Sequence, residues 1–144
     1  MKTVNPYLNF AGTTEEAFNF YKSIFGGEFL VLQRFKDTPD GAKMPAHERD
    51  KIMHVALPLG KNGVILMATD TLESMGQKLT YGNNSHLAVD AESEKEADTL
   101  FNSLAAGGTT VMPMEKMFWG SYFGMCVDRF GVQWMVSFDE KSEE

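Results

Sequence analysis

The chain of 144 residues is long enough for one sizeable hydrophobic core and too short for two ordinary domains, so we expect a single domain over 1–144. Its 20 acidic and 13 basic residues give a formal net charge of −7 without a lysine or arginine cluster, which argues against a nucleic-acid partner. No apolar run approaches the roughly 20 residues that cross a bilayer, and the N-terminus lacks a signal-peptide core. We therefore expect a cytoplasmic protein without a membrane partner.

The first half opens with a strand and a helix. The run NPYLNF predicts a strand over 5–10, because apolar and polar side chains alternate along it. Thr13 and Glu16 have the spacing of a capping box, and an apolar stripe of helical period begins at Ala17. The glycine pair in the sequence IFGG predicts the end of this helix.

Strand-like runs and two polar segments complete the first half. The runs predict three further strands, over 28–35, 52–60 and 63–70. The polar segment 36–51 lies between the first two of these strands, and the segment 71–83 links the two halves. Both segments are candidates to cover a cavity or a partner surface. The first module is therefore expected over about 1–70.

The second half repeats this order. It has a strand-like run over 85–90, a capping box at Ser93 and Glu96, and strand-like runs over 109–114, 122–128 and 131–138. The two helices match at an offset of 80 residues, and the last strands GVILM and GVQWM also match, which predicts an internal duplication. The second module is expected over about 84–138, followed by a charged tail over 139–144.

The predicted fold class is α+β, with two βαβββ modules. One helix per module can cover only one face of its strands, so the opposite faces are available for a shared cavity, which is the default place for a ligand. Alternation along the first and last strands predicts which side chains face that cavity. The predicted cavity side chains are Asn5, Tyr7, Asn9, Leu66, Asn84, His86 and Met135.

Three aromatic and two titratable residues complete the candidate site. Phe118, Trp119, Tyr122 and Phe123 are too dense for the core face of one strand, so some of them must line the cavity or an interface. We expect Phe118, Trp119 and Phe123 to line the cavity, with core packing as the alternative. His54 is the single titratable residue of an apolar strand, and Asp70 ends the next strand. We expect both as catalytic candidates, His54 as a general base or hydrogen-bond donor and Asp70 as a group that orients a ligand. The alternatives are a histidine that supports the sheet and an aspartate that caps the following turn.

Nearly the whole chain resembles a known family. The segments YLNFAGTTEEAFNFYKSIFGGEF, IMHVALPLG and MFWGSYFGMCVDRFGVQWMVSF are similar to the PhnB-like branch of the vicinal oxygen chelate superfamily, which includes glyoxalase I, bleomycin-resistance proteins and extradiol dioxygenases. The resemblance implies paired βαβββ modules around a U-shaped cavity, and a homodimer. Related proteins carry a demethylubiquinone methyltransferase label, but the sequence contains no Gly-x-Gly-x-x-Gly fingerprint that would support a self-standing methyltransferase.

The resemblance also allows a test for the metal centre of glyoxalase-type relatives. In those proteins one side chain on the first strand and one on the last strand of each module hold the metal. The corresponding positions here are Asn5 or Tyr7, Asn84 or His86, Leu66 and Met135. Neither a leucine nor a thioether replaces a carboxylate for a hard cation, so we expect no metal or other cofactor. A divergent metal set that includes His54, His86 and Asp70 stays open as an alternative.

The sequence therefore predicts a protein that binds an unidentified small molecule without the usual metal centre. Two alternatives stay open. One is an enzyme of the lyase or isomerase type, with a divergent metal site or with metal-free catalysis by His54 and Asp70. The other is a structural dimer whose sheets leave no pocket.

Overall fold

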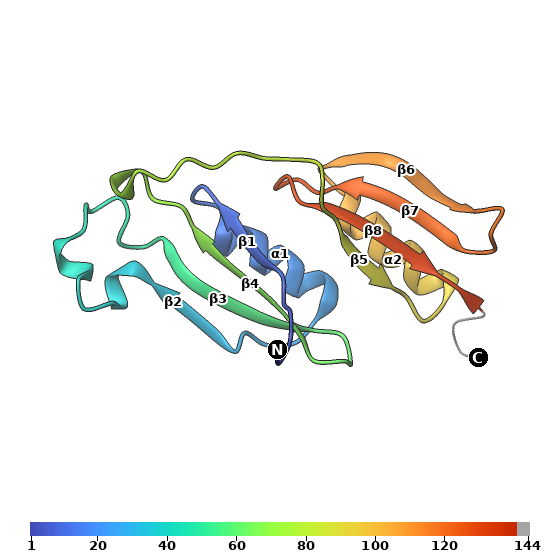
Figure 1. Ribbon diagram of the computed structural model, residues 1–144, viewed down its shortest axis with the longest axis horizontal. Helices are drawn as coiled ribbons and strands as arrows, with labels where there is room; N and C mark the ends of the chain where they lie inside the picture. The colour runs from blue at the N-terminus through green and yellow to red at the C-terminus, as the bar shows by residue number, and fades with distance from the viewer. Residues whose placement is uncertain (141–144) are drawn as a thin grey trace. The chain divides into compact units, whose positions relative to one another are not determined.

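The computed structural model describes residues 1–140 and divides the chain into two compact units, 1–80 and a second that begins at Tyr81. Each unit has a four-stranded mixed sheet with one long helix against one face (Figure 1). This confirms the α+β fold of two βαβββ modules. The end of the predicted charged tail, 141–144, lies outside the described residues. Among the described residues, no helix is long and apolar enough to span a membrane.

The first unit follows the predicted order. Its elements are β1 (Tyr7–Phe10), α1 (Thr14–Phe25), β2 (Val31–Arg34), β3 (Ile52–Leu59) and β4 (Val64–Asp70), with short 3-10 turns at Phe35–Asp37, Gly41–Lys43 and Glu73–Met75. The strands lie in the order β1-β4-β3-β2, with β1 parallel to β4 and the other pairs antiparallel. The first and last strands of the module are therefore neighbours in the sheet.

The second unit repeats this topology. Its elements are β5 (Leu87–Asp90), α2 (Glu94–Ala105), β6 (Thr109–Lys116), β7 (Tyr122–Val127) and β8 (Gln133–Phe138). The strand order is β5-β8-β7-β6, again with the first and last strands parallel. Each strand differs by only a few residues from the run predicted for it, because alternation and turn residues mark the strands locally.

Burial separates the two faces of the first sheet and corrects one prediction. Phe10 of β1 is fully buried, and its ring centroid lies 6.5 Å from that of Phe18 in α1. Leu66 was expected to face the cavity, but it is fully buried and pairs across the strands with the buried Leu57. Leu66 therefore belongs to the core, and its half-buried neighbour Met67 takes the opposite face. The prediction for β4 was therefore wrong by one position along the strand.

Helix α2 approaches its sheet closely at a glycine. A Cβ atom on Gly124 of β7 would lie 2.6 Å from the sulfur of Met114 and 3.0 Å from the ring of Phe101 in α2, so a larger residue would push the helix away. Tyr122, at the start of the same strand, donates a hydrogen bond of 2.5 Å to the Asp98 carboxylate of α2. That bond, together with burial, raises the pKa of Tyr122 to about 12.

The two helices begin differently, although their sequences predict the same capping box. Ser93 confirms the prediction, because its hydroxyl accepts a hydrogen bond from the Glu96 backbone N–H at 3.0 Å. Thr13 makes no side-chain cap hydrogen bond. The N-terminus of α1 instead lies against the Asp70 carboxylate, which accepts a hydrogen bond from the Thr14 N–H at 3.1 Å.

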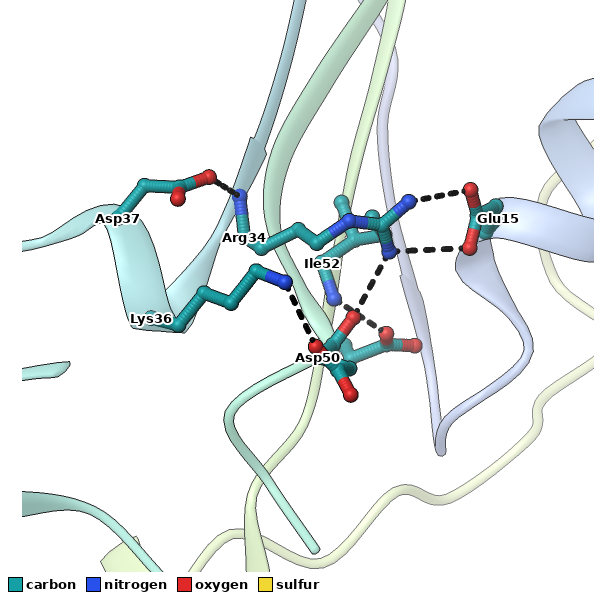
Figure 2. A network of polar contacts seen from close by, with 7 residues as sticks. Glu15, Arg34, Lys36, Asp37, Asp50 and Ile52 are labelled. Atoms are coloured by element: carbon teal, nitrogen blue, oxygen red, sulfur yellow. Dashed lines mark hydrogen bonds and ion pairs between the residues drawn. The ribbon is translucent and has the colours of Figure 1, made fainter. Parts of the chain in front are cut away.

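Ion pairs attach the start and the end of the polar loop after β2 to the body of the first unit (Figure 2). The Arg34 guanidinium donates to both oxygens of Glu15 in α1, at 3.0 and 2.6 Å, and to the backbone oxygen of Asp50 at 2.9 Å. Lys36 pairs with the Asp50 carboxylate at 3.1 Å, and Asp37 accepts from the Arg34 N–H at 3.2 Å. The bond from Arg34 lowers the pKa of Glu15, against an opposing effect of burial. The loop therefore has a defined path.

Glu48, near the end of this loop, attaches it to the segment after β4. Its side chain is 1% exposed, and its carboxylate accepts hydrogen bonds from the hydroxyl and the backbone N–H of Ser74, the latter at 3.2 Å. The hydroxyl bond is the largest cause of a lowered pKa for Glu48, and burial opposes it. The polar loop and the link between the modules are thus joined to each other.

This contact predicts an acid-sensitive stability. A carboxylate with a lowered pKa stabilises the fold above its unfolded pKa, near 4.5, and loses that contribution as the pH falls through the folded pKa. We expect Glu48→Gln to be less stable than the wild type at neutral pH, with a difference that shrinks below pH 4.5 in urea unfolding experiments. Glu28→Gln, which removes a surface ion pair, is the control and should change little. A difference that stays constant with pH would contradict the assignment.

Candidate functional site

The open face of the first sheet brings two predicted site residues together. Tyr7 of β1 and His54 of β3 lie 47 positions apart in sequence, yet the Tyr7 hydroxyl is 3.3 Å from His54 Nδ1. Their rings are stacked, with centroids 5.8 Å apart and an interplanar angle of 21°. In the tautomer with the proton on Nε2, the Tyr7 hydroxyl donates to Nδ1 and leaves the Nε2–H for another acceptor. Tyr7 thus orients the imidazole ring.

The side chains around this pair combine amides, a hydroxyl and a thioether. Gln33 of β2 pairs with His54 across the strands, and Asn9 of β1 pairs with Thr69 of β4. Met67 pairs with Tyr7 on one side and with Ala56 on the other. Gln33, Met67 and Thr69 were not predicted as site residues. The alignment of GVILM with GVQWM contains the signal for Met67, because it matches Met67, and not Leu66, with Met135.

Two predicted cavity residues, Asn5 and Asn84, lie before β1 and β5 and not within these strands. The Asn5 side chain accepts a hydrogen bond of 3.0 Å from the Ile65 backbone N–H, so it holds the chain entering β1 against β4. Asn84 is exposed in the segment that precedes β5. His86 is half-buried just before β5, where strand alternation would give it the same side as Ala88.

Asp70 occupies the interior of the first unit, in contrast to its expected role beside a ligand. It is 2% exposed, and one carboxylate oxygen accepts from the Gly12 N–H, the Thr14 N–H and the Thr14 hydroxyl, at 3.0, 3.1 and 2.6 Å. The other oxygen accepts from the Ile52 N–H at 2.8 Å. Both oxygens are therefore occupied by the turn before α1 and by the start of β3, and not by the turn that follows Asp70.

The open face of the second sheet carries the remaining predicted residues. Met135 of β8 pairs with Ala88 of β5 and with Met125 of β7. Beside β7, the Trp119 ring makes edge contacts with Phe118 and Phe123, at centroid distances of 5.0 and 6.3 Å. The structure thus gathers the three predicted aromatic residues into one cluster of the second unit.

The donor set does not fit the metal centre of glyoxalase-type relatives. The positions on the last strands that face away from the helices hold Met67 and Met135, whose thioethers are poor ligands for hard divalent cations. Within residues 1–140, no group of three or more His, Cys, Asp or Glu side chains is placed to hold a metal ion. The His54 imidazole is within hydrogen-bond distance of the Tyr7 hydroxyl, and the Asp70 carboxylate accepts hydrogen bonds from backbone N–H groups.

With this fold and this site in place, comparison with known proteins assigns the chain to a family. Residues 2–137 match the family model described as 3-demethylubiquinone-9 3-methyltransferase, and the chain belongs to that family. The chain is also similar to Protein YjdN of Escherichia coli, with 30% identity over 93% of each sequence. The family description names an activity, whereas the match itself establishes common descent and fold.

Solved structures agree with this assignment. The chain is similar to protein PA1353 of Pseudomonas aeruginosa, with 37% identity, a TM-score of 0.84 and coverage of 96% of this chain and 98% of that one. It is similar to a putative 3-demethylubiquinone-9 3-methyltransferase, PhnB protein, of Bacillus cereus, with 29% identity, a TM-score of 0.77 and coverage of 95% and 99%. A glyoxalase-related enzyme of Fulvimarina pelagi, at 20% identity and a TM-score of 0.64, shares the fold over 96% of this chain and 89% of its own. The predicted PhnB-like branch and glyoxalase-type fold are confirmed.

The buried carboxylate gives a prediction that separates a fold role from a ligand role. Asp70→Asn removes the charge and leaves at least one backbone N–H without its acceptor, so we expect a loss of about 2–4 kcal/mol in the free energy of unfolding. Asp50→Asn removes a similar charge from an exposed ion pair and should cost no more than about 1 kcal/mol. Urea unfolding followed by circular dichroism measures both. Equal stabilities for Asp70→Asn and the wild type would contradict the fold role.

Proposed function

We propose that this protein binds a small organic molecule on the open face of its first sheet, without the usual metal centre. The observation that carries the proposal is the Tyr7–His54 pair, in which a half-exposed ring and an imidazole are held together on the face away from α1. The fold supports it, because each sheet has a helix on one face and the other face is available to a ligand.

The chemistry of this face suits a planar ligand with a hydrogen-bond acceptor. The Tyr7 ring and the Met67 thioether supply an apolar, deformable surface. His54 and Gln33 supply hydrogen-bonding groups on the same side of neighbouring strands. The methionines at the last-strand positions support the absence of a hard-metal centre, because they remove the carboxylate that such a centre requires.

Ligand binding by variants of His54 and of the control residue His47 tests this proposal. We expect fluorinated phenols and benzamides to bind in 19F NMR titrations, before and after the protein is treated with EDTA. His54→Ala and Tyr7→Phe should weaken binding about three- to tenfold, the equivalent of one hydrogen bond. His47→Ala, which changes a histidine that is 71% exposed in the polar loop, should leave it unchanged.

Elemental analysis of the same samples decides the metal question. One tightly bound divalent ion per chain that is lost in His54→Ala would contradict the metal-free proposal and favour the enzyme with a divergent metal site. Failure of every probe to bind the wild type would favour the structural dimer without a pocket.

We also propose that the protein is a cytoplasmic homodimer. The outermost strand of the second sheet, β6, has a free edge and exposes Val111 and Met112, at 55% and 37%. Such an edge is a template for pairing with another chain, and a second copy would cover both the backbone groups and the apolar side chains.

This proposal is tested by the mass of the protein in solution. Light scattering coupled to gel filtration should give twice the chain mass of 16.1 kDa, and Val111→Lys should shift the protein toward the monomer. Lys95→Ala, on the exposed surface of α2, is the control and should remain dimeric. A wild-type protein that is monomeric at all concentrations would disprove the homodimer.

A further inference from the structure

A second candidate site lies wholly within the second unit. A hollow of about 280 Å³ is lined by residues at the ends of β5 and β8 and in the turn between β6 and β7. Strands β5 and β8 are neighbours in the sheet (Figure 1). It is lined by Asp90, Ala91, Trp119, Ser121, Ser137 and Asp139. This set shares no residue with the Tyr7–His54 pair.

The hollow contains acidic side chains, of which Asp139 is already engaged in another interaction and Asp90 can meet a ligand. Two of the six residues are aspartates, and none is a lysine or an arginine. Asp90 is oriented by the Ser137 hydroxyl, which donates to one of its carboxylate oxygens at 3.2 Å. The other oxygen of Asp90 is left available to a ligand, because none of the hydrogen bonds described within residues 1–140 uses it. A cation entering the hollow would gain from this charge.

Ser121 supplies a hydroxyl to the lining of the hollow. It is 7% exposed, and its hydroxyl has no hydrogen-bond partner within residues 1–140. No fully buried side-chain nitrogen or oxygen in that part of the chain lacks a partner. The hydroxyl must therefore keep access to solvent, and the hollow that Ser121 lines is where that access exists. Its oxygen can accept a hydrogen bond from a bound donor.

Trp119 forms an aromatic wall of the hollow. It is 58% exposed, and its ring makes edge contacts with Phe123 and with Phe118, which is itself 98% exposed. The backbone beside it is closed by hydrogen bonds from the Met117 N–H to the Ser121 oxygen, at 2.8 Å, and from the Gly120 N–H to the Met117 oxygen, at 3.0 Å. A positioned indole of this kind attracts organic cations through its π face and packs against apolar groups.

We propose that this hollow binds a small organic ammonium ion that carries an apolar or aromatic group. The ammonium group pairs with the Asp90 carboxylate and donates to the Ser121 hydroxyl, while the apolar group packs against the Trp119 indole. Ser137 holds the carboxylate in place. The inference goes beyond the proposed function, because its residues belong to the second unit alone.

Titration with benzylammonium chloride at low ionic strength tests the proposal. The full chain has two tryptophans, and Trp134 is 1% exposed, so a saturable change in fluorescence on addition of benzylammonium reports on Trp119. We expect Asp90→Asn to weaken binding about tenfold and Ser121→Ala to weaken it about threefold. Benzoate, which has the opposite charge, and benzyl alcohol, which has none, should bind at least about tenfold more weakly.

The control is a charge change of the same size elsewhere on the second unit. Glu115→Gln removes one negative charge from the exposed strand β6 and should leave benzylammonium binding within about twofold of the wild type. Circular dichroism of each variant shows whether it is folded. If Asp90→Asn does not fold, Ser121→Ala still tests the site. Because the site uses neither Tyr7 nor His54, Tyr7→Phe and His54→Ala should bind benzylammonium as the wild type does.

Three results would overturn the assignment. Equal weakening by Glu115→Gln and Asp90→Asn would show a general attraction to the net charge of −7 in place of a site. Equal binding of benzyl alcohol would show an apolar surface without selection for a cation. Absence of saturable benzylammonium binding, in a protein that still binds phenols through His54, would reject the hollow and leave the proposed function standing.

Discussion

The first unit depends on one buried carboxylate. Asp70 ends β4, and its two oxygens accept hydrogen bonds from the turn after β1, from the first residue of α1 and from the start of β3. A carboxylate is far more costly to bury than a neutral group, and these four donors compensate for the lost hydration. The same charge lies at the positive end of the helix dipole. One side chain therefore sets the position of α1 on the sheet, and with it the face that stays open for a ligand.

The two units reach the same topology with different polar contacts. In the second unit, Ser93 caps its own helix, and Asp128 organises the turn between β7 and β8 by accepting hydrogen bonds from the Val132 N–H and the Trp134 indole. Duplication has kept the strand order and the apolar faces, because these follow from the spacing of hydrophobic residues. The polar contacts have diverged, so each unit offers different chemistry on its open face.

This divergence explains how one fold can carry two unlike candidate sites. The first open face has the Tyr7–His54 pair, with the Gln33 amide beside His54 on the neighbouring strand. The second has an aromatic cluster beside a hollow with two carboxylates. At the last-strand positions where the resemblance to glyoxalase-type proteins implies a metal-binding carboxylate, both units have a methionine. A shared fold therefore does not by itself imply shared site chemistry.

Local sequence patterns predicted both helices, all eight strands and the duplication, because helical period, alternation and turn residues act over a few positions. They also pointed to His54, Tyr7 and Trp119 as candidate site residues. The match of GVILM with GVQWM already points to Met67, but alternation alone does not say which face is open, and the tertiary structure decided that Met67 and not Leu66 lies on it. It also decided that Asp70 replaces Thr13 as the helix cap, 56 residues from Thr14 in sequence. Contacts of this length follow from strand register, which no local pattern encodes.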